Sequence, residues 1–370
     1  MKYNWQQSDW PQFRYDLKAV EDELFSFAQK AGNISGLIKG LSDDAQQEAI
    51  IDLMVAEAIK TSQIEGEDLL RSDVMSSIRN NLGLNSKPEK VSDKNAQGAG
   101  ELMVEVRNTF ADPLTEAMLF KWHRTLLGAF SKRLMVGAWR DHAEPMQIVS
   151  GAYGKEKVNF EAPPSSTVPA EMKTFIQWFN DTAPEGKKAI KYPAVRAAVA
   201  HLYFESIHPF EDGNGRIGRA ISEKALSQGL GRPVIMSLSK AIEAKKKLYY
   251  ASLKAAHGSN EITEWLKYFV NTVNEAQEDA ERLIEFILFK TRLFDRFSDN
   301  MNERQIKALN RMLENGPAGF DGGMRTQKYM SITGASKATT ARDLQHLVDI
   351  GVFKQVGNGR STHYLIREDI

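Results

Sequence analysis

The spacing of apolar residues along the chain predicts a mainly helical protein. Over 43–68, apolar residues recur near helical spacing among good helix formers, at Ile50, Ile51, Met54, Ala58 and Ile59. Comparable patterns predict helices over 68–83, 100–110, 114–130, 170–182 and 216–229, and further helices near 239–257 and 261–290. Residues 85–98 are polar and predict a loop.

Two segments depart from this amphipathic pattern. Residues 192–207 begin with Pro193 in the first turn and carry apolar residues nearly all round, which predicts a buried central helix. Residues 146–164 have β-branched and aromatic residues on both sides of Gly151, Gly154 and Lys155, which predicts a β-hairpin.

The last 70 residues have a different organisation. A helix is expected over 302–316, a helix-turn-helix over 326–351, and two strands joined by a Gly-Asn-Gly turn over 352–366. This order predicts a winged helix-turn-helix module. We therefore expect an N-terminal helical region, a central domain and this module, over 1–105, 106–295 and 296–370.

Composition narrows the class of protein without naming it. The 370 residues hold 48 Lys and Arg against 48 Asp and Glu, so net charge predicts no general attraction to nucleic acid or anionic membrane. The absence of cysteine excludes disulfides, thiol catalysis and thiolate metal sites. Neither a signal peptide nor an apolar run near the ~20 residues of a membrane helix is recognisable, so we expect a cytoplasmic protein.

The segment "HPFEDGNGRIGR", residues 208–219, concentrates the candidate chemistry. It joins two predicted helices, and glycines just before a helix allow a ligand to approach the free N–H groups of its first turn. Such a loop is an anion site, and phosphate fits it. Arg216 and Arg219 are three residues apart, so they share one helix face and can bind phosphate oxygens.

Two further side chains extend this site to a reaction. Asp212 would repel phosphate unless a cation lay between them, and Mg²⁺ held by one carboxylate and phosphate oxygens meets that need. His208 has a side chain suited to a general base. Together these groups predict attack of a hydroxyl on a nucleotide phosphate.

The same segment contains a misleading match. Residues 213–218 also fit the dinucleotide fingerprint G-x-G-x-x-G, which requires a preceding strand. Here a predicted helix precedes it, and the Walker phosphate loop is absent from the sequence.

The segment resembles the signature of the Fic family, H-x-F-x-[DE]-G-N-G-R-x-x-R. All eight defined positions match, and average residue frequencies put a chance match on the order of 10⁻⁸. The resemblance implies an all-α Fic-type core and transfer of AMP from ATP to a protein hydroxyl. It implies His208 as the base, Asp212 as the Mg²⁺ ligand, Phe210 as a buried anchor, and a phosphate-binding set of Gly213, Asn214, Gly215, Arg216, Gly218 and Arg219. The phosphorylating branch of the family has Lys at position 215, and this sequence has Gly.

The resemblance also implies roles for segments outside the signature. The hairpin over 146–162 corresponds to the family's target-positioning flap. Residues 249–266 resemble the segment that lines the adenine pocket, with Tyr249, Tyr250 and His257 as candidates. His257 stands where relatives often have Asn, and simple core packing is an equal alternative for all three residues.

The stretch "TSQIEGED", residues 61–68, places a glutamate at a predicted helix end. Gly66 is a residue favoured at helix C-termini, so Glu65 would lie in the last turn of the helix. The helix dipole disfavours a negative charge there, and a cationic partner would relieve that cost. The stretch resembles the inhibitory motif of Fic proteins, [ST]-x-x-x-E-[GN], through Thr61, Glu65 and Gly66. The resemblance implies that Glu65 pairs with Arg219 and keeps ATP from its productive position.

The sequence therefore predicts a protein adenylyltransferase that depends on Mg²⁺ and ATP and is inhibited by its own Glu65. The acceptor would be a Ser, Thr or Tyr hydroxyl of a target protein, and of the chain itself. The same glutamate would position water to remove AMP in some relatives. The alternative is a nucleotide-sensing, DNA-binding transcriptional regulator. Its helix 336–350 carries Lys337 and Arg342 but also Asp343 and Asp349, so DNA contact, protein contact and homodimer formation remain open for the last module.

Overall fold

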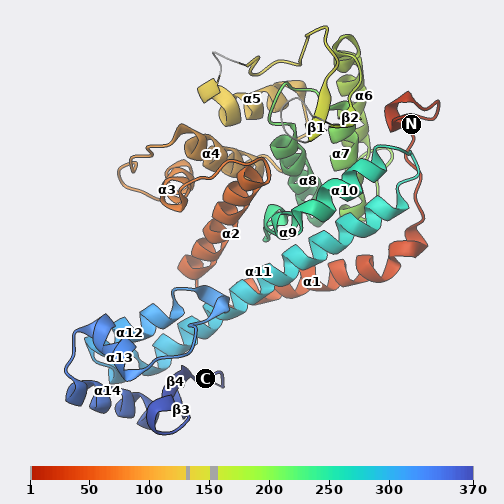
Figure 1. The fold of residues 1–370 in the computed structure, drawn as a ribbon. Helices are drawn as coiled ribbons and strands as arrows, with labels where there is room; N and C mark the ends of the chain where they lie inside the picture. Colours follow the sequence, from red (N-terminus) through yellow and green to blue (C-terminus); the bar gives the residue numbers. More distant parts are fainter. Residues whose placement is uncertain (1, 131–133, 151–156, 370) are drawn as a thin grey trace. The chain divides into compact units, whose positions relative to one another are not determined.

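The computed structural model describes residues 2–130, 134–150 and 157–369, and it is mainly helical, as predicted (Figure 1). The chain forms two compact units. The larger consists of the residues up to Ile34 and of Ile50–Ala280, and the smaller consists of Ser35–Ala49 and of the chain from Glu281 onward. Three long helices contribute residues to both units: α1 (Glu21–Lys39), α2 (Asp43–Ile64) and α11 (Thr263–Phe297).

The larger unit is built around α7 (Pro193–Ile207), which is the predicted buried helix. It lies beside α8 (Asn214–Leu230), as Figure 1 shows, and the indole of Trp265 in α11 donates a hydrogen bond to its Ala198 carbonyl oxygen at 2.9 Å. The remaining helices of this unit are α3 (Arg71–Asn81), α4 (Lys94–Asn108), α5 (Glu116–Leu127), α6 (Val168–Asp181), α9 (Leu238–Ala244) and α10 (Lys246–Ala256). Because α7 is covered by neighbouring helices, the loop at its end has a rigid base.

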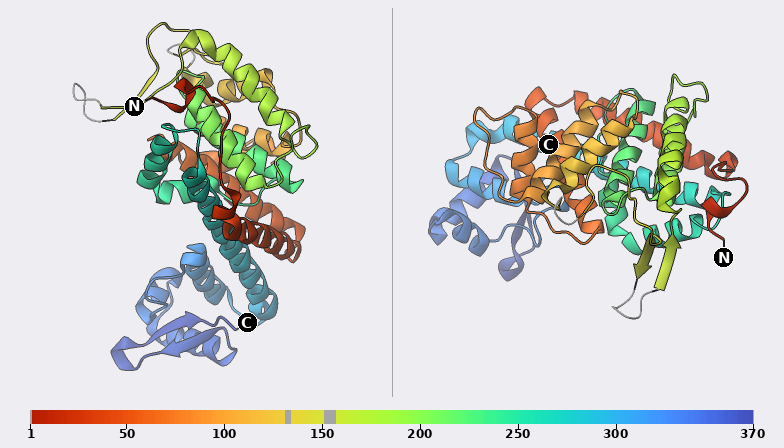
Figure 2. Two further views of the ribbon diagram at one scale, coloured as in Figure 1. Left: turned by 90° about the vertical axis from the view of Figure 1, so that its right-hand side faces the viewer. Right: turned by 90° about the horizontal axis from the view of Figure 1, so that it is seen from above.

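The predicted hairpin is present as two antiparallel strands, β1 (Gln147–Ser150) and β2 (Lys157–Glu161), drawn in Figure 2. Phe160 of β2 is buried, whereas the residues Val149 and Val158 are 49% and 41% exposed. Gly151, Gly154 and Lys155, around which the hairpin was predicted, lie outside the described residues.

Two boundaries differ from the sequence prediction for a local reason, and one helix is additional. The loop expected over 85–98 ends at Asp93, whose side chain accepts a hydrogen bond from the N–H of Asn95 and caps α4. The single helix expected near 239–257 is two helices, because Lys245 leaves the helical conformation with ψ 34°. Helix α1 was not among the expected helices, although it buries Leu24, Phe27, Ala31, Ile34 and Ile38 at helical spacing.

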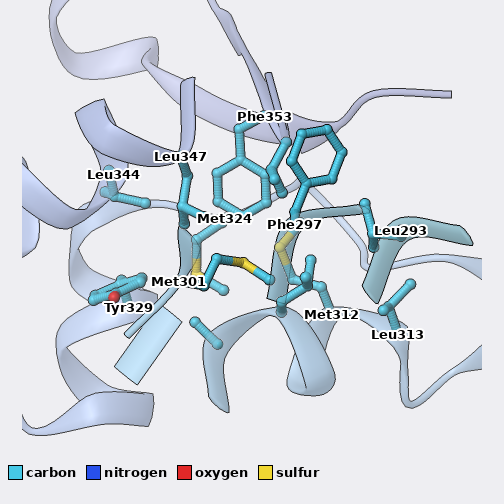
Figure 3. Packing of buried hydrophobic residues seen from close by; sticks show 13 residues of the cluster. Leu293, Phe297, Met301, Met312, Leu313, Met324, Tyr329, Leu344, Leu347 and Phe353 are labelled. Carbon is cyan, nitrogen blue, oxygen red and sulfur yellow. The ribbon is translucent and has the colours of Figure 1, made fainter. Parts of the chain in front are cut away.

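The smaller unit contains α12 (Glu303–Leu313), α13 (Thr326–Thr333), α14 (Lys337–Asp349) and the antiparallel strands β3 (Phe353–Val356) and β4 (His363–Ile366). This is the element order of the predicted module. Its core is rich in methionine and aromatic side chains, among them Phe297, Met301, Met324, Tyr329 and Phe353 (Figure 3).

No helix among the described residues is both long enough and apolar enough to cross a membrane. The cytoplasmic location expected from the sequence stays a prediction.

Candidate active site

The loop between α7 and α8 holds the candidate base at a fixed place. His208 ends α7 in the left-handed conformation, with φ 50°, and its N–H donates to the Phe204 carbonyl oxygen at 2.9 Å. The buried guanidinium of Arg140 donates to the carbonyl oxygen of His208 at 2.8 Å and to that of Pro163 at 2.6 Å. Arg140 therefore fixes the backbone that carries His208, a role that no motif in the sequence indicated.

Phe210 and Asn214 give the loop its shape. Phe210 is fully buried, as expected, and its ring stacks on that of His123 with 4.0 Å between centroids. The Asn214 side chain accepts a hydrogen bond from the Phe210 N–H at 2.9 Å and donates to the Phe210 carbonyl oxygen at 2.8 Å. Both ends of this amide thus close the loop, and a phosphate contact of Asn214 would have to come from its backbone N–H.

His123 was not foreseen, yet it supports the same loop. Its Nδ1 accepts a hydrogen bond from the Gly137 N–H at 2.8 Å, so its Nε2 is the donor to the Asp212 carbonyl oxygen at 3.1 Å. Burial lowers the pKa of His123 and favours this neutral form. A lone histidine more than 80 residues before the signature gave no signal of this contact.

The loop leads into the first turn of α8, where an anion site is expected. Gly213 precedes the helix with φ 78°, a conformation that glycine adopts without strain. The N–H groups of the first turn have no intrahelical acceptor and point toward the positive end of the helix dipole. A Cβ at Gly215 would overlap Glu65 Oε1, so the carboxylate of Glu65 lies against this turn.

Glu65 and Arg219 are in direct contact, which confirms the predicted pairing. Arg219 Nη2 donates to Glu65 Oε1 at 2.7 Å and to the Thr61 carbonyl oxygen at 2.9 Å, and Arg219 Nε donates to Thr61 Oγ1 at 2.7 Å. The Arg219 side chain is 1% exposed and that of Glu65 is 29% exposed. Burial alone would lower the pKa of Arg219, but the neighbouring Glu65 carboxylate outweighs it and holds that pKa above its ordinary value.

A second glutamate from the same stretch binds the other signature arginine. Arg216 Nη1 donates to Glu67 Oε2 at 2.7 Å, and the Arg216 side chain is 3% exposed. Gly66 lies between the two glutamates with φ 87°, which lets the chain turn so that both carboxylates reach α8. Glu67 was not predicted; the Glu-Gly-Glu sequence opposite two arginines was the available signal.

The predicted adenine-pocket residues lie around one cavity with His208 and Glu65. The cavity has a volume of about 550 Å³, and its lining includes Glu65, His208, Gly215, Tyr249, Tyr250 and His257. Tyr249 is buried and its hydroxyl lies 2.8 Å from His201 Nε2, whereas the Tyr250 hydroxyl donates to the Ile64 carbonyl oxygen at 3.2 Å. His257 stacks on Phe160 of β2 with 3.8 Å between centroids, and burial lowers its pKa to about 3.

Comparison with known proteins agrees with this geometry. Residues 113–226, which include the whole loop and most of α8, match the model of the Fic/DOC family. The chain carries a Fic domain. Residues 3–84 match a domain of unknown function (DUF4172), and residues 321–367 match the C-terminal domain of the transcriptional regulator DIP2311-like.

Curated relatives resemble the Fic domain over part of their length. The protein adenylyltransferase fic-1 of Caenorhabditis elegans is 36% identical over 87 residues, which are 24% of this chain and 15% of the relative. A probable protein adenylyltransferase of Aquifex aeolicus is 31% identical over 123 residues, 30% of this chain and 36% of the relative. The chain thus spans about a third or less of these two proteins.

A solved Fic family protein from Desulfovibrio desulfuricans G20 shares the fold. It is 19% identical to this chain, with a TM-score of 0.50, and the match covers 93% of this chain and 96% of that one. At this identity the likeness concerns the fold, and it supports the predicted mainly helical, Fic-type class.

Asp212 directly precedes Gly213 at the start of α8, and its carboxylate would suit a one-carboxylate magnesium site. Its Oδ1 accepts a hydrogen bond from the Gly213 N–H at 2.6 Å, its Oδ2 lies 3.7 Å from Arg216 Nη2, and its side chain is 52% exposed. The described residues hold no group of three or more His, Asp or Glu side chains that could bind a metal. Mg²⁺ often uses one or two carboxylates together with substrate phosphates, and Asp212 suits that arrangement.

Gly218 occupies a different place from the other signature glycines of the Fic domain. A Cβ at this position would lie 2.5 Å from Glu205 Oε1 and 3.3 Å from the His201 ring. Gly218 thus lies where α8 meets α7, and its Cα faces protein side chains. The phosphate role implied for it by the family resemblance stays a prediction.

Proposed function

We propose that this chain transfers AMP from ATP to a hydroxyl side chain of a target protein, and that Glu65 restrains the reaction. The observation that carries the proposal is the common cavity that joins His208 to the first turn of α8 at Gly215. It brings a base to the place where a phosphate would bind. The curated relatives named above as protein adenylyltransferases support the same reaction class.

In this reaction the hydroxyl oxygen of the target attacks the α-phosphorus of ATP. The bond from that phosphorus to the oxygen bridging the β-phosphate breaks, and diphosphate leaves. The hydroxyl proton passes to a ring nitrogen of His208, which acts as general base. The left-handed turn at His208 and the hydrogen bond from Arg140 support its position at the end of α7.

The ATP phosphates would be bound by the N–H groups at the start of α8 and by Arg216 and Arg219. Helix dipole and guanidinium groups both favour negative charge there. Asp212 would hold Mg²⁺, which when bound neutralises phosphate charge. The adenine ring of ATP would lie against an aromatic wall of Tyr249, Tyr250 and His257, since all three line the cavity.

The hairpin is a suitable guide for the target. Ile148, Val149, Asn159 and Phe160 of β1 and β2 line the cavity, so the strands reach the reaction site. An extended segment of the target could add to the hairpin as a further strand and present a Ser, Thr or Tyr hydroxyl.

Glu65 restrains the reaction because it binds Arg219, which the ATP phosphates also need. Its carboxylate holds Arg219 and lies against Gly215, at the turn where phosphate would bind. Two anions do not share such a site without a large electrostatic cost. The same carboxylate, next to the cavity, would position a water molecule for removal of AMP from a modified protein.

Labelled ATP tests the reaction type directly. The protein is incubated with Mg²⁺ and with ATP labelled at either the α- or the γ-phosphate, and self-labelling is followed on a gel. AMP transfer retains only the α-label, whereas phosphorylation retains only the γ-label. Retention of the γ-label, or of neither label in wild type and in Glu65→Gly, would contradict the proposal.

A regulator that binds DNA is the second candidate, because residues 321–367 match a transcriptional regulator's C-terminal domain. In α14, Lys337 and Arg342 are exposed, whereas Asp343 is buried and does not oppose DNA. Fluorescence anisotropy with labelled duplex DNA, with and without ATP, tests this function. Salt-dependent binding that Lys337→Ala and Arg342→Ala weaken would support it.

A further inference from the structure

Glu205 is a buried carboxylate for which the reaction described above has no role. It lies in α7, one helical turn before His208, and its side chain is 4% exposed. A buried ionised carboxylate is costly unless charged or hydrogen-bonding groups surround it. Its surroundings therefore indicate what it does.

Ionisable groups from three helices face Glu205. His201 and His208 are on its own helix or directly after it, Arg219 comes from α8, and Tyr249 comes from α10. Glu65 holds Arg219 at 2.7 Å, and Tyr249 lies 2.8 Å from His201 Nε2. Each of these three groups therefore has at least one partner, although His201 Nδ1 and Arg219 Nη1 have none among the described residues.

His208 is the neighbour whose side chain lies within ion-pair distance of Glu205. Its Nδ1 lies 3.6 Å from Glu205 Oε2, and among the described residues this buried nitrogen has no hydrogen-bond partner. Glu205 Oε1 likewise has none within the described part of the chain. The His208 side chain is 13% exposed and that of Glu205 is 4% exposed, and a small rotation would bring Nδ1 and Oε2 to hydrogen-bond distance.

We propose that Glu205 is the positioning residue for His208. Its carboxylate accepts a hydrogen bond from Nδ1–H and so leaves the Nε2 lone pair for the proton of the incoming hydroxyl. When Nε2 takes that proton, the carboxylate stabilises the imidazolium. The inference rests on the proposed function, in which His208 is the base, and it assigns the tautomer that the base uses.

Electrostatics and packing agree with this assignment. Burial alone would raise the pKa of Glu205, but His208, His201 and Arg219 outweigh it, and its pKa lies below the ordinary value. Glu205 is therefore an ion that can stabilise a cation. The absence of a side chain at Gly218 makes room for it, because a Cβ there would lie 2.5 Å from Oε1.

Glu205→Gln tests the proposal, in a Glu65→Gly background that raises the signal. Glutamine has the same shape, but its NH₂ group can donate to Nδ1 and so favours the opposite tautomer. Loss of tautomer control should reduce the rate of self-labelling by about 10²–10⁴-fold, the range for loss of a general base. The KM for ATP should remain unchanged, because Glu205 acts on His208 and not on the nucleotide.

The split between rate and affinity separates this role from a structural one. A variant that disturbs the fold of the site would also change the KM for ATP, whereas loss of tautomer control lowers the rate alone. His257, also near His208, is not a competing charge at neutral pH, since burial lowers its pKa to about 3.

Nitrogen NMR of the histidine rings gives a readout that needs no activity. The chain has 7 histidines, and His208 is assigned by comparison with His208→Ala. We expect protonated Nδ1 in the parent protein and protonated Nε2 in Glu205→Gln. An unchanged tautomer, whether or not the rate falls, or an unchanged rate would overturn the proposal.

A matched control is Glu223→Gln in α8. Glu223 is a glutamate of the same unit that lines a separate small cavity with Glu57 and Arg107, and burial raises its pKa to about 8. Its substitution should leave the His208 tautomer and the KM for ATP unchanged. If the Glu65→Gly protein does not label itself, the proposed function fails, whereas the NMR comparison still decides on Glu205.

Discussion

The surroundings of Asp343 in the smaller unit and the cavity of the larger unit differ in how their buried polar groups are paired. In the smaller unit, the buried carboxylate of Asp343 accepts hydrogen bonds from the Tyr329 hydroxyl at 3.0 Å, from Arg304 Nε at 2.9 Å and from Asn302 Nδ2 at 3.2 Å. In the larger unit, buried atoms near the cavity lack partners among the described residues, namely His208 Nδ1, Glu205 Oε1, Arg216 Nε, Arg219 Nη1 and His257 Nε2.

This contrast distinguishes polar groups that serve the fold from polar groups that serve a ligand. An unsatisfied buried donor or acceptor costs about 1–3 kcal/mol. Such costs are tolerated where substrate or a moving proton supplies the missing partner. Asp343 would then matter for stability, whereas the cavity groups would matter for the reaction.

The largest effect is expected for His208→Ala. The substitution removes the proposed base, so the rate of self-labelling should fall by about 10²–10⁴-fold. ATP binding, measured by calorimetry, should remain nearly intact, because the base acts on the incoming hydroxyl. Labelling at the wild-type rate would exclude His208 from the mechanism.

Glu65→Gly should act in the opposite direction. It removes the anion that holds Arg219 and leaves the other groups of the site in place. Losing an inhibitory contact of about 1.4 kcal/mol or more raises the rate of self-labelling tenfold or more. Quantified labelling with ATP is the measurement, and no increase over wild type would refute the inhibitory role.

The control for that increase is Arg219→Ala in the Glu65→Gly background. If Glu65 acts by withholding Arg219 from the nucleotide phosphates, removal of the arginine should cancel the gain. A double variant that still labels as fast as Glu65→Gly would mean that Glu65 inhibits by another route.

Asp212→Asn should produce a smaller loss, confined to the metal. Asparagine keeps an oxygen for the Gly213 N–H, so the loop should be preserved, but one formal charge at the ion is lost. We expect the Mg²⁺ concentration for half-maximal labelling to rise about tenfold, equal to ~1.4 kcal/mol of binding. An unchanged Mg²⁺ titration would place the ion elsewhere.

Sequence reasoning succeeded where the chemistry is local. The signature places His208, Asp212 and both arginines within twelve residues, and apolar residues nearly all round predicted α7 as the buried helix that precedes them. The Glu65–Arg219 contact spans 154 residues, but a family motif stood at each end of it.

What the sequence could not provide were contacts between distant segments without a motif. Arg140 and His123 support the signature loop through backbone carbonyl oxygens, which carry no sequence signal. Asn214 was expected to hold phosphate, but its amide is used by the Phe210 backbone, since loop geometry decides where an amide points. Lys245 breaks a helix that its apolar spacing favours, and tertiary contacts override such propensities.

The smallest effect on labelling, and the sharpest test of the contrast between the units, is expected for Asp343→Asn. Burial alone would raise the pKa of Asp343, but Arg304, Tyr329 and Asn302 outweigh it and hold that pKa below its ordinary value. The carboxylate therefore stabilises the smaller unit above pH ~4, and this contribution is lost as pH falls through the lowered pKa. Because Arg304 is 43% exposed, solvent screens the pair, and asparagine should cost about 1–2 kcal/mol at neutral pH.

Hydrogen exchange of the full chain measures this loss of stability. In peptides from α13 and α14 we expect amide protection to be about tenfold weaker in Asp343→Asn than in wild type. The difference between wild type and Asp343→Asn should shrink as pH is lowered below ~4, where the wild-type carboxylate also becomes neutral. Self-labelling should remain at the wild-type rate, because Asp343 serves only the fold of its own unit. If labelling falls together with protection, buried charge in the smaller unit also supports the reaction, and the distinction between the two units is wrong.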